Sequence, residues 1–319
     1  MKLRPEDCLP EDAERATLVG RAWVPGDHPG PSPVIIRGAD VVDISDTFPT
    51  MSELLNTESI EKKMDDLNGT KIGVIDSLLE NSAWHSQDKK HPYLLAPVDL
   101  QAVKACGVTF AQSMLERVIE ERAKGDPSAA QGIRNDIQKV IGLDLESIIP
   151  GSSEAEQLKE VLIKKDMWSQ YLEVGIGPDA EVFTKAQPMS VMGIGAQIGI
   201  LEKSEWNNPE PEITLAVNAR GKILGATLGN DVNLRDIEGR SALLLGKAKD
   251  NNASAAIGPF IRLFDENFSL DDVRMAELSL TVRGLDQFTL HGRSSMSKIS
   301  RDVADLVDET IGRHHQYPD

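Results

Sequence analysis

The alternation of apolar and polar residues over positions 213–228 constrains the fold of this 319-residue chain more than any other feature. Within 213–217 and again within 222–228, apolar residues recur at every second position, as in a strand with one buried face. The intervening Asn218-Ala219-Arg220-Gly221 contains a glycine and has the composition of a turn. The segment therefore predicts a β-hairpin.

The same change of period divides the rest of the chain. A second hairpin is expected around residues 284–286, between strands at about 276–282 and 287–291. Before residue 180, apolar residues recur at three- and four-residue spacing, which predicts three amphipathic helices. These helices are expected at 113–123, 127–141 and 153–165.

The N-terminal part of the sequence has a different pattern of apolar residues. Residues 1–98 contain short apolar patches separated by Pro- and Gly-rich turns, with one helical stretch at about 50–66. We expect a small N-terminal α/β domain over 1–98 and a second, β-rich domain over 99–319.

Charge and cysteine content exclude several classes of partner. A formal net charge of −17 argues against unassisted binding to nucleic acid or to an anionic membrane. Only two cysteines occur, Cys8 and Cys106, so a disulfide framework and a thiolate zinc site both lack material. Because the chain shows neither a signal peptide nor a long apolar run, we expect a soluble cytoplasmic protein.

Three carboxylates stand where the first hairpin brings two strand ends together. Glu210 and Glu212 flank Pro211, so both side chains point to the same face of an extended backbone. Asp231, at the end of the second strand, supplies a third oxygen ligand. Such a group faces either solvent or a hard cation, Mg²⁺ first, with Mn²⁺ or Ca²⁺ as alternatives.

The order of these motifs resembles the fumarylacetoacetate hydrolase superfamily. Glu-x-Glu is followed by Asn-Asp-Val with Arg235 four residues after the Asp, and then by Lys249 eight residues before Ile257-Gly258-Pro259. The resemblance covers about residues 99–318. It implies an α+β fold with a mixed β-roll, β-sandwich-like catalytic core, a Glu-Glu-Asp metal site and a 2-keto acid substrate.

Within this superfamily the chain is more similar to the 2-keto-3-deoxy-pentonate dehydratases of oxidative pentose degradation. The similar segments lie at 105–120, 168–188, 206–212, 229–260 and 314–318. The resemblance implies removal of water from a D-xylonate/D-arabinonate-type substrate, or its L-arabinonate counterpart, to give 2,5-dioxopentanoate. The stereoisomer stays open.

One departure from the hydrolase pattern favours dehydration. Hydrolases of the superfamily carry a His-x-x-Glu pair that activates water, whereas this chain has Ser113 before Glu116, and a hydroxyl cannot act as a base at neutral pH. An acylpyruvate-type C–C hydrolase is therefore the alternative that Ser113 opposes. A second departure is Glu238, where hydrolases often have Gln.

The resemblance also implies roles for single residues. Lys249 is the candidate base or proton relay, with a pKa expected to be lowered by a neighbouring cation. Glu116 would position a water or protonate the departing hydroxyl, and Arg235 would bind the substrate carboxylate. The further substrate-side candidates are Thr109, Ser113 and Lys185.

Two expectations concern assembly and the C-terminus. The resemblance implies a homo-oligomer, a dimer or a tetramer, acting on a small-molecule 2-keto sugar acid. Proteins of this kind continue with further strands that complete the roll, so the chain is expected to lack its final strands. A truncated inactive member is the corresponding alternative. His314 and His315 are not expected to form a second metal site, because adjacent side chains rarely point to one ion.

Overall fold

The structure, a computed structural model, describes residues 2–64, 67–107 and 148–310, together with residues 109, 110, 114, 118, 119, 132 and 135. Contacts within the chain define two compact units. The first contains Met1–Ala105 and Thr184–Val273, and the second contains Cys106–Phe183 and Arg274–Gln316.

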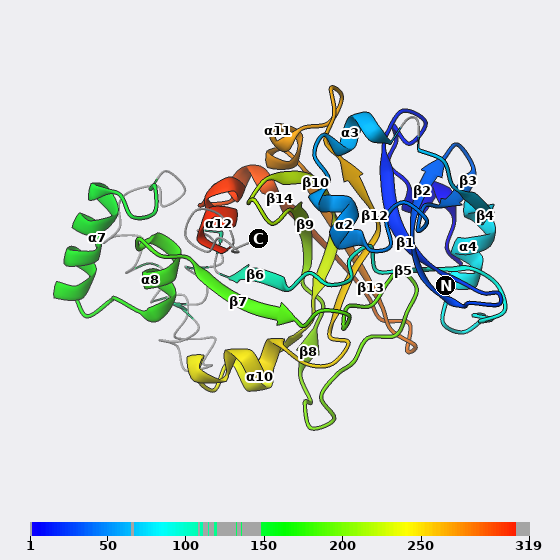
Figure 1. Ribbon diagram of the computed structural model, residues 1–319. Coiled ribbons are helices and arrows are strands. Elements are labelled where there is room, and N and C mark those ends of the chain that lie inside the picture. The colour runs from blue at the N-terminus through cyan, green and yellow to red at the C-terminus, as the bar shows by residue number, and fades with distance from the viewer. Residues whose placement is uncertain are drawn as a thin grey trace. The chain divides into compact units, whose positions relative to one another are not determined.

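An eight-stranded antiparallel sheet forms the first unit (Figure 1). Its strands follow the order β4-β3-β2-β1-β12-β10-β9, and β5 pairs with β1. The strands are β1 (Leu18–Val24), β2 (Gly30–Arg37), β3 (Asp40–Asp43), β4 (Thr70–Val74), β5 (Tyr93–Leu95), β9 (Pro211–Val217), β10 (Ile223–Asp231) and β12 (Ala255–Leu263).

Neighbouring residues of a strand point to opposite faces of the sheet, and both faces of this sheet carry buried apolar residues. On one face Val19 and Ile35 pack with Met51, Leu54 and Leu55 of helix α2 (Met51–Asn56) and with helix α3 (Ile60–Lys63). On the other face Leu18 and Val34 pack in a separate cluster with helix α4 (Ile75–Ser82). The predicted helical stretch at 50–66 is thus two short helices, α2 and α3.

Helix α2 begins where two side chains accept its free backbone N–H groups. The Thr50 hydroxyl accepts from the Glu53 N–H. The buried Asp99 carboxylate accepts from the N–H groups of Met51, at 2.6 Å, and Ser52, at 3.1 Å. These bonds satisfy donors that the first turn of a helix leaves unpaired.

Both predicted hairpins are confirmed. In the first, β9 and β10 pair antiparallel from Val217↔Ile223 to Pro211↔Asn230. The Asn218 side-chain oxygen accepts the N–H groups of Arg220 and Lys222, and Gly221 adopts a φ of +77°, which favours glycine. In the second, β13 (Glu277–Arg283) pairs with β14 (Thr289–Ser295), whose end lies later than predicted.

Short elements complete the first unit. The two-residue strands β8 (Asn207–Asn208) and β11 (Asn233–Leu234) pair antiparallel. Helix α9 (Arg235–Glu238), a 3₁₀ turn (Ala242–Leu244) and helix α10 (Leu245–Lys249) follow in the chain. The other elements of the N-terminal half are helix α1 (Pro5–Cys8) and strand β6 (Val103–Gly107), which pairs with β7 (Glu181–Ala186).

The second unit has its own core. Helix α7 (Ser153–Lys164) confirms the helix predicted at 153–165, and its residues Ala155, Leu158 and Leu162 are buried. They pack in one cluster with residues of helix α8 (Gln170–Ile176). The second unit also contains a 3₁₀ turn (Met296–Lys298) and α12 (Val303–Thr310). Helix α11 (Leu270–Arg274) belongs to the first unit up to Val273.

Some sequence predictions do not coincide with this organisation. The helices expected at 113–123 and 127–141 lie largely outside the described residues. Residues up to 98 share one sheet with strands β9, β10 and β12, so a separate N-terminal domain and the roll or sandwich details of the predicted core are not confirmed. Within the described part of the chain, every helix is too short or too polar to span a lipid bilayer.

Candidate metal centre

The hairpin register brings the three predicted carboxylate ligands together. Glu212 lies opposite Gly229, and the Asp231 N–H donates to the Glu210 carbonyl oxygen at 2.9 Å. One oxygen from each of Glu210, Glu212 and Asp231 lies within 4.8 Å of the others. Pro211 is accommodated because β9 is an edge strand of the sheet.

Two lysines face these carboxylates. The Lys249 Nζ donates to Glu210 Oε2 at 2.5 Å and to Asp231 Oδ2 at 3.1 Å. The Lys185 Nζ lies 2.9 Å from Asp231 Oδ1 and donates to the carbonyl oxygens of Val232 and Lys249. Each oxygen of the buried Asp231 therefore has an ammonium beside it. Among the described residues, no ammonium forms an ion pair with Glu212.

Burial places Lys185 in a supporting position. Its side chain is only 2% exposed, and its Nζ contacts Asp231 and backbone carbonyls. An ammonium held in this way orients Asp231 and offsets its charge. This arrangement favours a role behind Asp231 over the direct contact with substrate expected from the sequence.

The pKa values of the two lysines move in opposite directions, and that of Glu212 rises strongly. Burial raises the pKa of Glu212 to about 8, and the charges of Asp231 and Glu210 add to this rise. Burial also raises the pKa of Asp231 and lowers that of Lys185. For Lys249 burial acts in the lowering direction, but Glu210 and Asp231 outweigh it, so its pKa is raised.

The raised pKa of Lys249 belongs to the metal-free chain, whereas the lowered pKa expected from the sequence belongs to an amine beside a bound divalent cation. Without the ion, two carboxylates contact the Nζ. Opposite charges at hydrogen-bonding distance favour the charged form of an amine. Lys249 is therefore a cation while Glu210 and Asp231 are both ionised.

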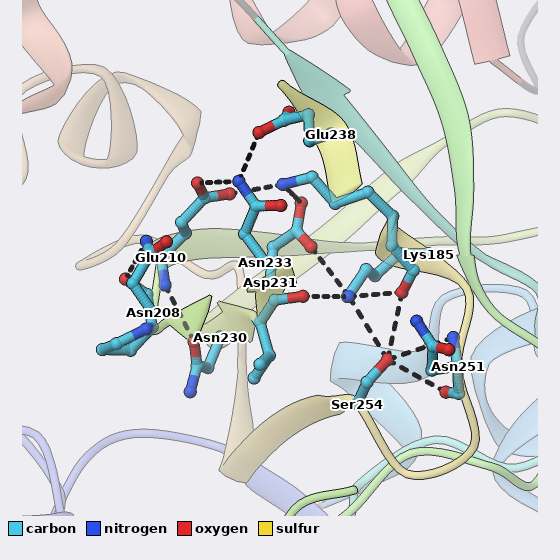
Figure 2. Close-up of polar contacts among 12 residues, drawn as sticks. Lys185, Asn208, Glu210, Asn230, Asp231, Asn233, Glu238, Asn251 and Ser254 are labelled. Carbon is cyan, nitrogen blue, oxygen red and sulfur yellow. Dashed lines mark hydrogen bonds and ion pairs between the residues drawn. The ribbon is translucent and has the colours of Figure 1, made fainter. Parts of the chain in front are cut away.

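Asn233 is a site residue that the sequence reasoning missed. Its side chain is fully buried, and its Nδ2 donates to Glu210 Oε1 at 3.0 Å and to Glu238 Oε2 at 2.6 Å. Figure 2 shows Asn233 between these two carboxylates. The available signal was its place two residues after Asp231, but an asparagine there does not reveal its contacts.

The charges and donors present suit a divalent cation. Four carboxylates, those of Glu210, Glu212, Asp231 and Glu238, surround two ammonium groups, so full ionisation leaves the cluster with two negative charges in excess. Three convergent oxygen ligands without His or Cys match Mg²⁺ and other hard ions.

The remaining predicted site residues fall into three groups. Arg235 begins helix α9 and places its guanidinium carbon 5.5 Å from the centre of the Trp206 ring. Thr109 belongs to the second unit, where its carbonyl oxygen accepts from the Ser300 N–H. Ser113 and Glu116 lie outside the described residues.

Comparison with known proteins connects this geometry with a family. The chain is 32% identical over 165 residues to a probable 2-keto-3-deoxyxylonate dehydratase of Haloferax volcanii, covering 52% of this chain and 55% of the relative. It is 32% identical over 142 residues to the 2-dehydro-3-deoxy-D-arabinonate dehydratase of Saccharolobus solfataricus, covering 44% and 45%. The chain thus spans about half the length of the curated relatives it matches. No protein-family model matches it.

Solved structures agree with the family resemblance. A 2-keto-3-deoxy-D-arabinonate dehydratase complexed with magnesium and 2,5-dioxopentanoate superposes with a TM-score of 0.63 at 19% identity, covering 95% of this chain and 84% of the other. A fumarylacetoacetate hydrolase of Exiguobacterium antarcticum superposes with a TM-score of 0.50 at 14% identity, covering 93% and 82%. The chain has the fumarylacetoacetate hydrolase fold. The resemblance drawn from the sequence motifs is confirmed, and the large antiparallel sheet is the part of this fold that carries Glu212 and Asp231.

In this fumarylacetoacetate hydrolase-like chain, metal binding is expected to release a proton. Glu212, with a pKa of about 8, is protonated at pH 6.5 and must ionise to bind a cation. We predict release of about one proton per Mg²⁺ at pH 6.5 and an affinity that rises up to about tenfold per pH unit until pH 8. Calorimetry in two buffers of different ionisation enthalpy measures this release. Affinity that is independent of pH between 6.5 and 8 would contradict the assignment of Glu212.

The same group predicts the pH dependence of folding without metal. The folded protein binds the Glu212 proton up to pH about 8, whereas the unfolded chain loses it near 4.5. The stabilisation is therefore complete below pH 4.5 and is lost as the pH rises toward 8. Thermal unfolding of the metal-free protein should show this loss, and Glu212→Gln should flatten it.

Proposed function

We propose that this chain is a Mg²⁺-dependent hydro-lyase that converts a 2-keto-3-deoxy-pentonate of the D-xylonate/D-arabinonate type into 2,5-dioxopentanoate and water, in oxidative pentose degradation. The observation that carries the proposal is the convergence of Glu210, Glu212 and Asp231 beside Lys249. The named dehydratase relatives support the same reaction class.

Glu210, Glu212 and Asp231 would hold the metal, with Asn233 and Lys185 keeping Glu210 and Asp231 in place. When bound, Mg²⁺ supplies a Lewis acid that polarises the keto group of the substrate. Mn²⁺ and Ca²⁺ are possible substitutes, because the donor set is made of carboxylate oxygens. Glu210 and Glu212 are partly exposed to solvent, whereas Asp231 is buried, so a substrate would reach the metal from the side of the two glutamates.

Lys249 is the proposed carrier of the proton removed from C3. Its Nζ contacts two of the three proposed ligands, Glu210 and Asp231. A cation bound by these carboxylates would offset their charge and so remove the attraction that raises the pKa of Lys249. The neutral amine can then accept the C3 proton while the C4 hydroxyl leaves. A later transfer of a proton from C5 to C3 gives an enol with a C4=C5 double bond. The proton of its C5 hydroxyl then moves to C4 to form the aldehyde, and one water is lost overall.

The other residues keep their predicted roles as proposals. Arg235 would bind the substrate carboxylate, and Glu116 would assist departure of the hydroxyl. Thr109 and Ser113 would contact substrate hydroxyls. A homo-oligomer, as a dimer or a tetramer, and a cytoplasmic location also stay predictions.

Product analysis tests the proposal. Protein stripped of metal and then supplied with Mg²⁺ is incubated with 2-keto-3-deoxy-D-xylonate, and 2,5-dioxopentanoate is followed through a semialdehyde dehydrogenase. Magnesium-dependent product supports the dehydratase. Pyruvate released from an acylpyruvate, without dehydration of the sugar acid, would instead identify the C–C hydrolase. A folded, magnesium-binding protein inactive in both assays would indicate an inactive family member.

A further inference from the structure

Trp206 and Arg235 form a cation–π pair, and Arg235 lies four positions after the metal-ligand candidate Asp231. The guanidinium carbon of Arg235 lies 5.5 Å from the centre of the Trp206 ring, and Trp206 is 61% exposed to solvent. We propose that Trp206 is a positioning residue, whose ring holds the Arg235 guanidinium ready to bind the carboxylate of a 2-keto acid. This inference rests on the proposed function and adds a recognition element to it.

The backbone brings the two residues together. Strands β8 and β11 pair through Asn208↔Asn233 and Asn207↔Leu234. Trp206 precedes Asn207 and Arg235 follows Leu234, so both stand at the same end of this short ladder. The Asp236 N–H then donates to the Trp206 carbonyl oxygen at 3.4 Å. The pairing register of β8 and β11 therefore determines which ring lies beside Arg235.

Asp236 fixes the segment that carries the indole. Its carboxylate accepts from the Ser204 hydroxyl at 2.7 Å and from the Glu205 N–H at 3.0 Å. The Ser204 hydrogen bond lowers the pKa of Asp236, and the Glu205 N–H adds to this effect, so the carboxylate stays ionised. An exposed tryptophan on a backbone tied at this point can serve as a rigid surface.

The arginine is also close to the metal ligands along the chain. Arg235 lies two positions after Asn233, which donates to Glu210, so the two Cα atoms are at most about 7 Å apart. Among the residues that the structure describes, Arg235 makes neither an ion pair nor a hydrogen bond to a carboxylate. The clustered carboxylates at the site instead engage Lys249, Lys185 and Asn233.

A cation–π contact is compatible with recognition of a carboxylate. In the part of the chain that the structure describes, the Arg235 guanidinium makes no side-chain hydrogen bond, so its N–H groups are available for a two-pronged contact with a planar anion. Because Arg has a long, flexible side chain, a surface that restricts it reduces the ordering that binding must otherwise impose. Loss of the ring should therefore weaken binding of the anion without weakening binding of the metal.

Pyruvate is a suitable probe because it carries the 2-keto acid group alone. Calorimetry with Mg²⁺-loaded protein should show that Trp206→Ala binds pyruvate between about threefold and thirtyfold more weakly. Trp206→Phe, which keeps an aromatic face, should restore binding to within about threefold of the wild type. Trp84→Ala, at another exposed tryptophan, is the matched control and should leave binding unchanged.

A double-mutant cycle shows whether Trp206 acts through Arg235. In an Arg235→Ala background, Trp206→Ala should cause no further loss, and Mg²⁺ affinity should be the same in all variants. With the sugar acid, Trp206→Ala should raise KM more than it lowers kcat. Unchanged pyruvate affinity in Trp206→Ala, or an equal loss in the Arg235→Ala background, overturns the inference.

The outcomes separate this inference from the proposed function. Trp206-dependent pyruvate binding by a protein that does not dehydrate the sugar acid would sustain the inference and remove the dehydratase. If the protein dehydrates the sugar acid but Trp206→Ala leaves pyruvate affinity unchanged, the dehydratase is supported and the inference about Trp206 is overturned. Absence of pyruvate binding by the Mg²⁺-loaded protein would overturn the inference.

Discussion

Replacing Lys249 by methionine is expected to lower kcat about a thousandfold while Mg²⁺ binds at least as tightly as in the wild type. Loss of a positioned acid–base group costs roughly 10²- to 10⁴-fold. The same change removes a positive charge that contacts Glu210 and Asp231, which strengthens their attraction for a cation. Steady-state kinetics and calorimetry together measure both effects.

The control for this prediction lies on the same helix. Lys247 is exposed, two residues before Lys249 in α10, so Lys247→Met should leave kcat and Mg²⁺ affinity unchanged. Because removing one partner of a buried ion pair destabilises a fold by about 3–5 kcal/mol, unfolding of Lys249→Met is compared with and without Mg²⁺. A folded Lys249→Met variant that keeps more than a tenth of the wild-type kcat would exclude Lys249 as the base.

Replacing Glu212 by glutamine is expected to weaken Mg²⁺ binding more than about a hundredfold and to abolish magnesium-dependent turnover. Removal of a direct ligand should cost at least as much as removal of a group behind a ligand, which costs about 10- to 100-fold. The fold should persist, because burial already raises the pKa of Glu212 to about 8 and a neutral amide resembles the protonated acid. Calorimetry gives the affinity, and circular dichroism confirms folding.

Glu202→Gln provides the comparison for Glu212→Gln. Glu202 is an exposed carboxylate in the same unit, so its replacement removes the same charge from the chain without touching the cluster. Any effect shared by both variants reflects the change in net charge. Full turnover in Glu212→Gln would rule out Glu212 as a metal ligand.

The sequence predicted the local parts of the site because they depend on short-range rules. Period-two patterning and the turn at Asn218 predicted the hairpin, and the hairpin register then brings Glu212 and Asp231 close together. The presence of Glu210, Glu212 and Asp231 in one cluster follows from positions within 22 residues of one another.

The parts that sequence reasoning could not reach depend on distant contacts. Lys185 lies 46 positions before Asp231, and its burial follows from tertiary packing that no local pattern reports. In the same way, β1 and β12 pair across more than two hundred residues, which joins the N-terminal strands to the sheet that carries the site. A boundary inferred from composition near residue 98 has no means of anticipating such pairing.

The lysine pKa values show a second limit. The sequence places Lys249 near a cation site, but the direction of its pKa depends on which charges contact the Nζ and at what distance. In the metal-free chain two carboxylates contact the Nζ and raise its pKa, whereas the lowered pKa expected from the sequence refers to an amine beside a bound cation. Contacts of this kind decide between an amine that is ready to accept a proton and one that must first be released from its partners.

Titration of the metal-free protein with Mn²⁺, followed by electron paramagnetic resonance, shows whether the three carboxylates bind an ion. We expect one Mn²⁺ per chain in the wild type, a changed spectrum when 2-keto-3-deoxy-D-xylonate is added, and loss of the bound ion in Asp231→Asn. Absence of a bound ion in the folded wild type, or binding that Asp231→Asn leaves intact, would contradict the assignment of Glu210, Glu212 and Asp231 as a metal centre.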